Sequence, residues 1–136
     1  MRIAVDAMGG DLAPDEIVKG ASLAAQSLGV EILLVGQRER VEPILADLPS
    51  SGIEVLHASD VVEMQDLATR AARRRKDTSI AVAVRSVKEG QADALVSAGS
   101  TGATMVATLL GWGRIKGVDR PAIGTVMPTV NGRCVL

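Results

Sequence analysis

Residues 2–35, RIAVDAMGGDLAPDEIVKGASLAAQSLGVEILLV, decide the fold class of this chain. They begin with one apolar run, Arg2–Asp6, and end with a second, Glu31–Val35. Between the runs lie a glycine-rich turn and Pro14–Leu28, whose apolar residues recur at helical spacing. A strand, a helix and a second strand in this order predict two parallel strands, because parallel neighbours need a crossover connection.

The same alternation continues toward the C-terminus. Strands are expected at Ile53–His57 and Ala94–Ala98, and helices at Arg38–Leu48, from Asp77 or Thr78 to Gly90, and at Thr101–Leu110. Two last strands, Ala122–Met127 and Arg133–Leu136, are expected to be joined across Asn131-Gly132, a common hairpin sequence.

This pattern predicts a single α/β domain over residues 1–136, with three layers (α/β/α) and a mostly parallel sheet. The chain stops at Leu136, inside one of the expected strands. We therefore expect it to be the N-terminal portion of a longer chain.

Composition excludes several classes of function. The chain has 136 residues, is 47% hydrophobic, and carries 15 basic and 16 acidic residues. A net charge of −1 and a single aromatic residue, Trp112, argue against a nucleic-acid partner. The single Cys134 excludes an internal disulfide and a multi-cysteine zinc site. Without a signal-peptide pattern or an apolar run long enough to span a membrane, a cytoplasmic location is expected.

Two loops are the main candidates for a binding site, because ligands of doubly wound sheets bind beyond the carboxyl ends of the strands. The first follows the first strand and contains Asp6, Gly9, Gly10 and Asp11. Its glycines allow close backbone approach, whereas its two aspartates would repel a phosphate unless protonated, paired or bridged by a cation. The alternative is a tight turn in which Asp11 caps the following helix.

The second loop joins the fourth strand to its helix. It contains three hydroxyl residues and two glycines, namely Ser97, Gly99, Ser100, Thr101 and Gly102. Backbone N–H groups and hydroxyls at a helix start suit a phosphate or a developing oxyanion. The alternative is a helix N-cap at Ser100 or Thr101, which is compatible with binding.

Three more positions are weaker candidates. His57 closes the third strand at the same edge and could donate to a substrate oxygen, although a structural hydrogen bond is the alternative. The run Arg73–Lys76 could attract an anion, but its members cannot share one helix face. Arg120 precedes the fifth expected strand and offers a guanidinium suited to an anion. No nucleophile–base pair is evident, so covalent catalysis is not suggested.

Five segments in order along the chain together resemble the phosphate acyltransferase family. They are IAVDAMGGD (3–11), HASDVVEM (57–64), RRRKDTSIAVAV (73–84), VKEGQADALVSAGSTGA (87–103) and GRIKGVDRPA (113–122). The similarity covers essentially the whole chain but only the front of the family's longer chain. One departure is visible: Ser100 stands where the family usually has Asn.

The resemblance implies transfer of a long-chain acyl group from acyl carrier protein to inorganic phosphate. The acyl phosphate would then pass to a membrane glycerol-3-phosphate acyltransferase. The implied fold is similar to that of the phosphotransacetylase and isocitrate dehydrogenase class. The implied assembly is a homodimer close to the inner face of the membrane, with no organic cofactor. No residue is assigned as a metal ligand.

For that reaction the expected roles are divided among the candidates. The loop from Gly99 to Gly102, with Gly9 and Gly10, would bind phosphate or the oxyanion. Positive charge would come from Arg120 or from Lys76. Asp6 and Asp11 would orient those groups or the leaving thiol, and His57 would act as a donor to the thiolate.

Two other classes of protein stay open at this point. One is a sister enzyme, either a phosphotransacetylase that uses acyl-CoA or a nucleotide-dependent dehydrogenase. The other is a non-catalytic domain that binds acidic carrier protein through a basic helix.

Overall fold

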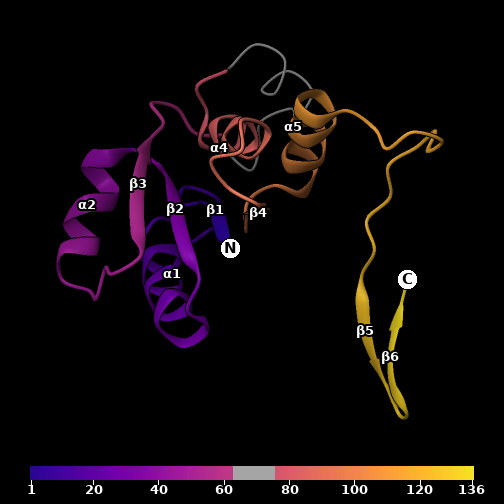
Figure 1. The fold of residues 1–136 in the computed structure, drawn as a ribbon, viewed down its shortest axis with the longest axis horizontal. Helices are drawn as coiled ribbons and strands as arrows, with labels where there is room; N and C mark the ends of the chain where they lie inside the picture. The colour runs from indigo at the N-terminus through magenta and orange to yellow at the C-terminus, as the bar shows by residue number, and fades with distance from the viewer. Residues whose placement is uncertain (63–75) are drawn as a thin grey trace.

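The computed structural model describes residues 1–62 and 76–136. Its central sheet has four parallel strands in the order β3-β2-β1-β4 (Figure 1). The strands are β1 (Arg2–Asp6), β2 (Glu31–Gly36), β3 (Ile53–His57) and β4 (Ala94–Val96). The helices are α1 (Asp15–Leu28), α2 (Arg38–Ala46), α4 (Ser79–Lys88) and α5 (Thr101–Trp112). The expected three-layer α/β/α fold with a mostly parallel sheet is confirmed.

The central strand β2 shows why the sheet needs helices on both faces. Ile32 and Leu34 pack with residues of α1 and α2, whereas Leu33 and Val35 pack with residues of α4. All four side chains are at most 2% exposed, because successive residues of a strand point to opposite faces. The continuous apolar run in the sequence therefore reflects burial on two sides.

Helix α5 does not lie on the sheet but packs against α4 (Figure 1). Ile80, Val84 and Ala107 form the contact between the two helices. The helices approach closely at Gly111, where an added Cβ would lie 2.3 Å from Val84 Cγ1. The Trp112 indole Nε1–H donates to the carbonyl oxygen of Val84 at 2.9 Å, which fixes the end of α5.

The hairpin near the C-terminus is confirmed, but its position in the sequence and its place in the fold differ from the expectation. Strands β5 (Val126–Thr129) and β6 (Gly132–Val135) form their own antiparallel sheet, which projects away from the central one (Figure 1). The first strand begins four residues later than the expected Ala122. Val130 and Asn131 occupy the turn, so it lies one residue before the expected Asn131-Gly132 pair.

Several element ends also differ from the expected ones. The expectation that Ala94–Ala98 is all strand was wrong, because β4 stops at Val96 and leaves Ser97 in the loop. Asp11 does not cap α1, since Pro14 occupies the N-cap position without a side-chain hydrogen bond. Thr78 caps α4 as one of the two expected candidates, through a hydrogen bond that its Oγ1 accepts from Ala81 N.

Candidate functional site

The strand order places a topological switch point between β1 and β4. After β1 the chain adds β2 and β3 on one side, and it then crosses to form β4 on the other side. Loops that leave two such strands diverge, which opens a crevice at their carboxyl ends. Asp6 ends β1, and Ser97 directly follows β4, whose Val96 is paired with Val5. The two loops predicted from the sequence therefore meet at this switch point.

Ser97 links the two loops through hydrogen bonds. Its hydroxyl donates to Asp6 Oδ2 at 2.8 Å and accepts from the backbone N–H of Gly99 at 3.1 Å. The other carboxylate oxygen of Asp6 accepts from Met8 N at 3.2 Å. Asp6 is only 4% exposed, so its carboxylate is committed to these contacts and orients the loops.

Glycine is required where the loops touch. A Cβ added at Gly9 would lie 2.6 Å from Asp6 Oδ2 and 2.8 Å from Gly99 N. Gly10 has a φ of +120°, a conformation that favours glycine, and it packs against Ala98. The paired glycines of the first loop therefore allow its backbone to lie against the second loop.

The N-terminus of α5 supplies the hydrogen-bond donors of the site. The Ser100 hydroxyl caps the helix by accepting from Ala103 N at 3.4 Å, as one of the two expected caps. Among the described residues, the backbone N–H groups of Thr101 and Gly102 have no hydrogen-bond partner. Free N–H groups at the positive end of a helix dipole favour an anion.

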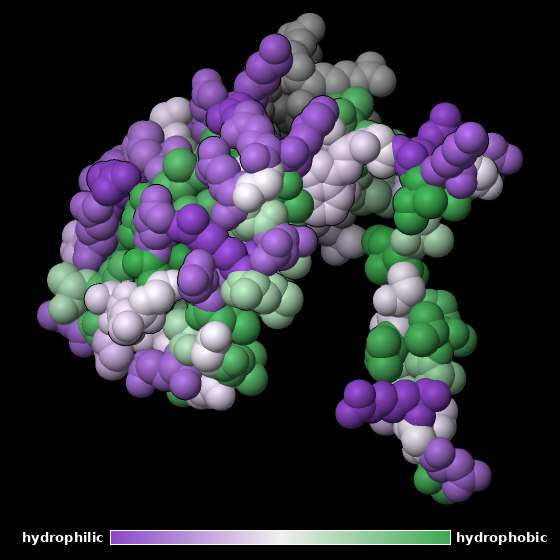
Figure 2. Space-filling model, viewed as in Figure 1, coloured by the Kyte–Doolittle hydropathy of each residue, from purple (hydrophilic) through white to green (hydrophobic). Residues whose placement is uncertain are grey.

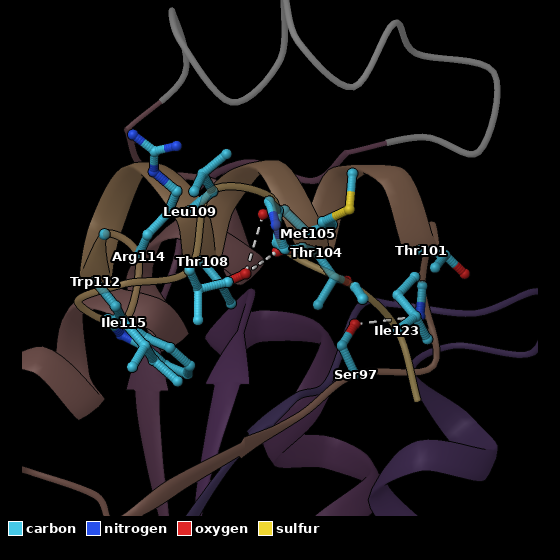
Figure 3. A pocket seen from close by; sticks show the side chains of 15 residues that line it. Ser97, Thr101, Thr104, Met105, Thr108, Leu109, Trp112, Arg114, Ile115 and Ile123 are labelled. Atoms are coloured by element: carbon cyan, nitrogen blue, oxygen red, sulfur yellow. Dashed lines mark hydrogen bonds between the residues drawn. The ribbon is translucent and has the colours of Figure 1, made fainter. Parts of the chain in front are cut away.

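Two cavities flank this loop. The inner one, about 10 Å³, is lined by Asp6, Gly9, Ser97 and Gly99 together with Ser79 and Ile80 of α4, and has room for about one water. The outer one, about 680 Å³, extends from Ser97, Gly99 and Thr101 along α5 (Figure 3). The loop thus lies between a small inner cavity and an outer cavity whose volume is typical of small-molecule sites.

His57 lies apart from the Asp6–Ser97 contact, and Asp11 forms no hydrogen bond with either of these two residues. His57 ends β3, which is two strands from β1, or roughly 10 Å at ordinary strand spacing. Its Nδ1 accepts from Arg38 N at 3.4 Å and lies 4.0 Å from Glu39 Oε2, so it contacts the start of α2. Asp11 is exposed in the turn before α1. The structure thus leaves His57 away from the junction of the two loops, whereas Asp11 follows Gly10, which packs against Ala98.

The basic candidates are also distributed over the molecule. Lys76 is exposed and lies two residues before Thr78, the N-cap of α4, while Ser79 lines the inner cavity. Arg120 is exposed in the segment between α5 and β5, and it lines neither of the two cavities described above. Arg73–Arg75 lie outside the described residues. Both cations adjoin lining residues in sequence: Lys76 precedes Ser79 of the inner cavity by three residues, and Arg120 directly precedes Pro121 of the outer cavity.

The apolar wall of the outer cavity was not predicted from the sequence. Met105, Leu109 and Trp112 of α5 line it, together with Ile115 and Ile123 from the following segment. The sequence of α5 could have indicated this wall, because the helix is apolar on nearly every side. Its apolar residues therefore include some that are not buried against α4.

The fold and the site together define a doubly wound α/β protein with free backbone N–H groups of a helix N-terminus at its switch point. This chain belongs to the family described as fatty acid synthesis protein, whose family model matches residues 1–136.

Curated relatives named phosphate acyltransferase match nearly the whole chain. The relative from Desulfitobacterium hafniense (strain DSM 10664 / DCB-2) is 59% identical over 134 residues, which cover 97% of this chain and 40% of the relative. The one from Heliobacterium modesticaldum is 56% identical over 135 residues, with the same coverage of each chain. The one from Geobacter sulfurreducens is 49% identical over 138 residues, covering 100% of this chain and 40% of the relative. The chain therefore spans about 40% of the length of these relatives.

The described residues show no cluster of three metal-ligating side chains. Nor does any helix within residues 1–62 and 76–136 have the length and apolar character needed to cross a membrane.

Proposed function

We propose that this chain forms the N-terminal wall of the active site of an acyltransferase that moves a long-chain fatty acyl group from acyl carrier protein to inorganic phosphate. The product is an acyl phosphate, which a membrane glycerol-3-phosphate acyltransferase then uses for phospholipid synthesis. The enzyme works as a homodimer in the cytoplasm at the inner face of the membrane.

The observation that carries the proposal is the junction of Asp6, Ser97 and Gly99 at the switch point. It places two free backbone donors of α5 beside an outer cavity, so an anion and a second substrate can lie next to each other. The names of the relatives supply the reaction class, since an acyl group and a phosphate are the two reactants of a phosphate acyltransferase.

The chemistry needs positioning more than activation of a nucleophile. A phosphate oxygen attacks the thioester carbonyl carbon, and the carbonyl π electrons move to its oxygen. When the tetrahedral intermediate collapses, the carbon–sulfur bond breaks and the carrier leaves as a thiolate, which takes a proton from solvent or a nearby acid. The Thr101 and Gly102 N–H groups hold the phosphate or the oxyanion, in a geometry fixed by Ser97 and Asp6.

The remaining residues have supporting roles in this proposal. Lys76, before α4, offsets part of the negative charge of the phosphate. His57 lies two strands from the junction, and Asp11 and Arg120 are exposed, so their contribution depends on contacts with the carrier protein or with the partner subunit.

The test uses this chain joined to the remainder of the Desulfitobacterium relative, with palmitoyl carrier protein and phosphate as substrates and released thiol as the readout. We expect Gly99→Val to lower turnover by about 100-fold or more, the effect of losing an oxyanion donor. A Cβ at Gly99 lies only 3.1 Å from the Gly9 Cα, so the larger side chain displaces the loop. The matched control is Gly20→Val, where an added Cβ meets nothing within 4 Å.

Equal turnover of the Gly99→Val and Gly20→Val enzymes would contradict the assignment of the loop. Palmitoyl-CoA is assayed in parallel as the acyl donor. Faster transfer from the CoA thioester than from the carrier protein would replace the proposed donor by that of a phosphotransacetylase.

A further inference from the structure

A groove along α5 leads away from the candidate site. Its cavity of about 680 Å³ lies between α5 and the segment that follows it (Figure 3). Ser97 and Thr101 lie toward one end, and Trp112 and Ile115 toward the other. The groove therefore begins at the anion-binding loop and runs along the length of the helix.

We infer that this groove holds the hydrocarbon chain of the acyl substrate, with its thioester end at Ser97 and Gly99 and its methyl end at Trp112. The inference rests on the proposed function and deepens it, because it assigns the acyl subsite to residues of this chain.

The dimensions of the groove fit a long acyl chain. From Thr101 to Trp112 the helix rises by about 16 Å. An extended chain advances about 1.25 Å per methylene at ordinary carbon–carbon geometry, so this length holds roughly a dozen methylenes. The volume also lies within the range of about 300–1,000 Å³ that is typical of small-molecule sites.

The lining is apolar even where the sequence has hydroxyls. Thr104 Oγ1 donates to the carbonyl oxygen of Ser100 at 3.1 Å, and Thr108 Oγ1 donates to that of Thr104 at 2.9 Å. Both hydroxyls are thus satisfied within the helix and need no polar ligand. Arg114, at the far end, donates through Nη1 to the carbonyl oxygen of Asp119 at 2.5 Å. Hydrocarbon is the ligand that the wall between the two ends matches, with backbone donors at the loop end and the Arg114 guanidinium at the far end.

Several residues of the apolar wall are open to solvent in the described part of the chain. Met105 is 37% exposed, Trp112 45%, Ile123 58% and Ile115 80%. Figure 2 shows that hydrophobic residues continue along the segment between α5 and the hairpin. An apolar surface of this kind is covered by a ligand, by a partner or, in a chain that spans about 40% of its relatives' length, by further residues. Its continuity with Ser97 and Gly99 favours the substrate over a second copy of the chain as the occupant.

The test uses Trp112, which is the only aromatic residue of the chain, so that its emission reports on the groove alone. The chain is titrated, below micelle formation, with stearic acid carrying a nitroxide near the methyl end. A second titration uses stearic acid with the nitroxide near the carboxyl group. We expect saturable loss of Trp112 emission with both probes and the larger loss with the methyl-end label.

Matched variants on one helix connect the quenching to the groove. Met105 lines the cavity, whereas Leu110 is exposed on α5 but lies about 140° around the helix and is not part of the lining. Met105→Asp is expected to weaken binding about tenfold or more, the effect of losing one apolar contact and adding a charge. Leu110→Asp is expected to leave it unchanged.

Three outcomes would overturn the inference: no saturable quenching, equal effects of the two variants, or stronger quenching by the carboxyl-end label. Sedimentation that shows a dimer closed over Trp112 and no quenching would assign the groove to a second copy. Quenching without acyl transfer in the completed enzyme would leave the groove standing while the proposed function fails. Transfer without quenching would place the acyl chain elsewhere.

Discussion

Ser97 is the residue at which the two loops depend on each other. Its hydroxyl is shared between a buried carboxylate at the end of β1 and the backbone N–H of Gly99. Hydrogen bonds to a buried charged group contribute about 1.5–3 kcal/mol each, so the contact fixes the loop geometry before any ligand binds. Gly9 completes the contact, because only a residue without Cβ leaves room for the Asp6 carboxylate and for Ser97.

Gly9→Ala is therefore expected to lower the free energy of unfolding by about 1–3 kcal/mol, the usual cost of forcing a methyl group into a packed site. Gly20→Ala is the control, since it lies in α1 with nothing within 4 Å of the added Cβ. It is expected to raise stability by about 1 kcal/mol through helix propensity. Urea unfolding followed by circular dichroism measures both, and a Gly9→Ala protein as stable as the wild type would refute the close contact.

At the scale of the element, α5 combines two functions in one helix. Its N-terminus presents donors at the switch point, and its outer side lines the groove that leads away from that point. The helix is tied to α4 by Ala107 and by the Trp112 hydrogen bond to Val84, so both functions rest on the same contact between helices.

Substitution of the α5 N-cap tests this element. Ser100→Ala removes the acceptor for Ala103 N and is expected to lower the free energy of unfolding by about 1 kcal/mol. Ser100→Asn is expected to change it by less than about 0.5 kcal/mol, because asparagine caps helices as well as serine does. The same urea titration compares the two variants, and equal stability of both would show that residue 100 does not act as a cap.

The sequence predicted the elements of the central sheet because apolar runs, helical spacing and glycine positions are local signals. Ser97, Gly9 and Gly99 were also found from local chemistry, since small and polar residues follow two strands. Local signals do not predict which of these residues lie together in the fold. His57 and Asp6 both end strands, yet their strands are separated by β2 in the sheet. The groove was missed because its two walls come from α5 and from a segment without regular structure.

For the whole molecule, the C-terminal segment is the part that depends least on the core. Residues 113–136 are all exposed, and β5 and β6 pair only with each other. In contrast, all of the buried residues in the described part of the chain lie between Ala4 and Ala107, in the four parallel strands, their helices and the loops that join them. The C-terminal segment, which forms one wall of the groove, is thus separable from the core.

A chain ending at Gly113 is expected to unfold with a free energy within about 0.5 kcal/mol of the full chain, as for changes at exposed positions. It loses Ile115 and Ile123 from the groove, so its Trp112 should bind the methyl-end nitroxide probe more weakly. Urea unfolding and the fluorescence titration measure the two effects. A large loss of stability would show that the segment supports the core.

The most direct test of the anion-binding loop is a titration of the isotope-labelled chain with inorganic phosphate, followed by proton–nitrogen correlation spectra. Chloride at matched ionic strength serves as the control. We expect saturable shifts of the Gly9, Gly99, Thr101 and Gly102 amides, because Gly9 and Gly99 lie where the two loops touch and Thr101 and Gly102 carry the free N–H groups of α5. Unmoved amides at these positions, or saturable shifts confined to Lys76, Arg120 or the β5–β6 hairpin, would contradict a phosphate site at the switch point.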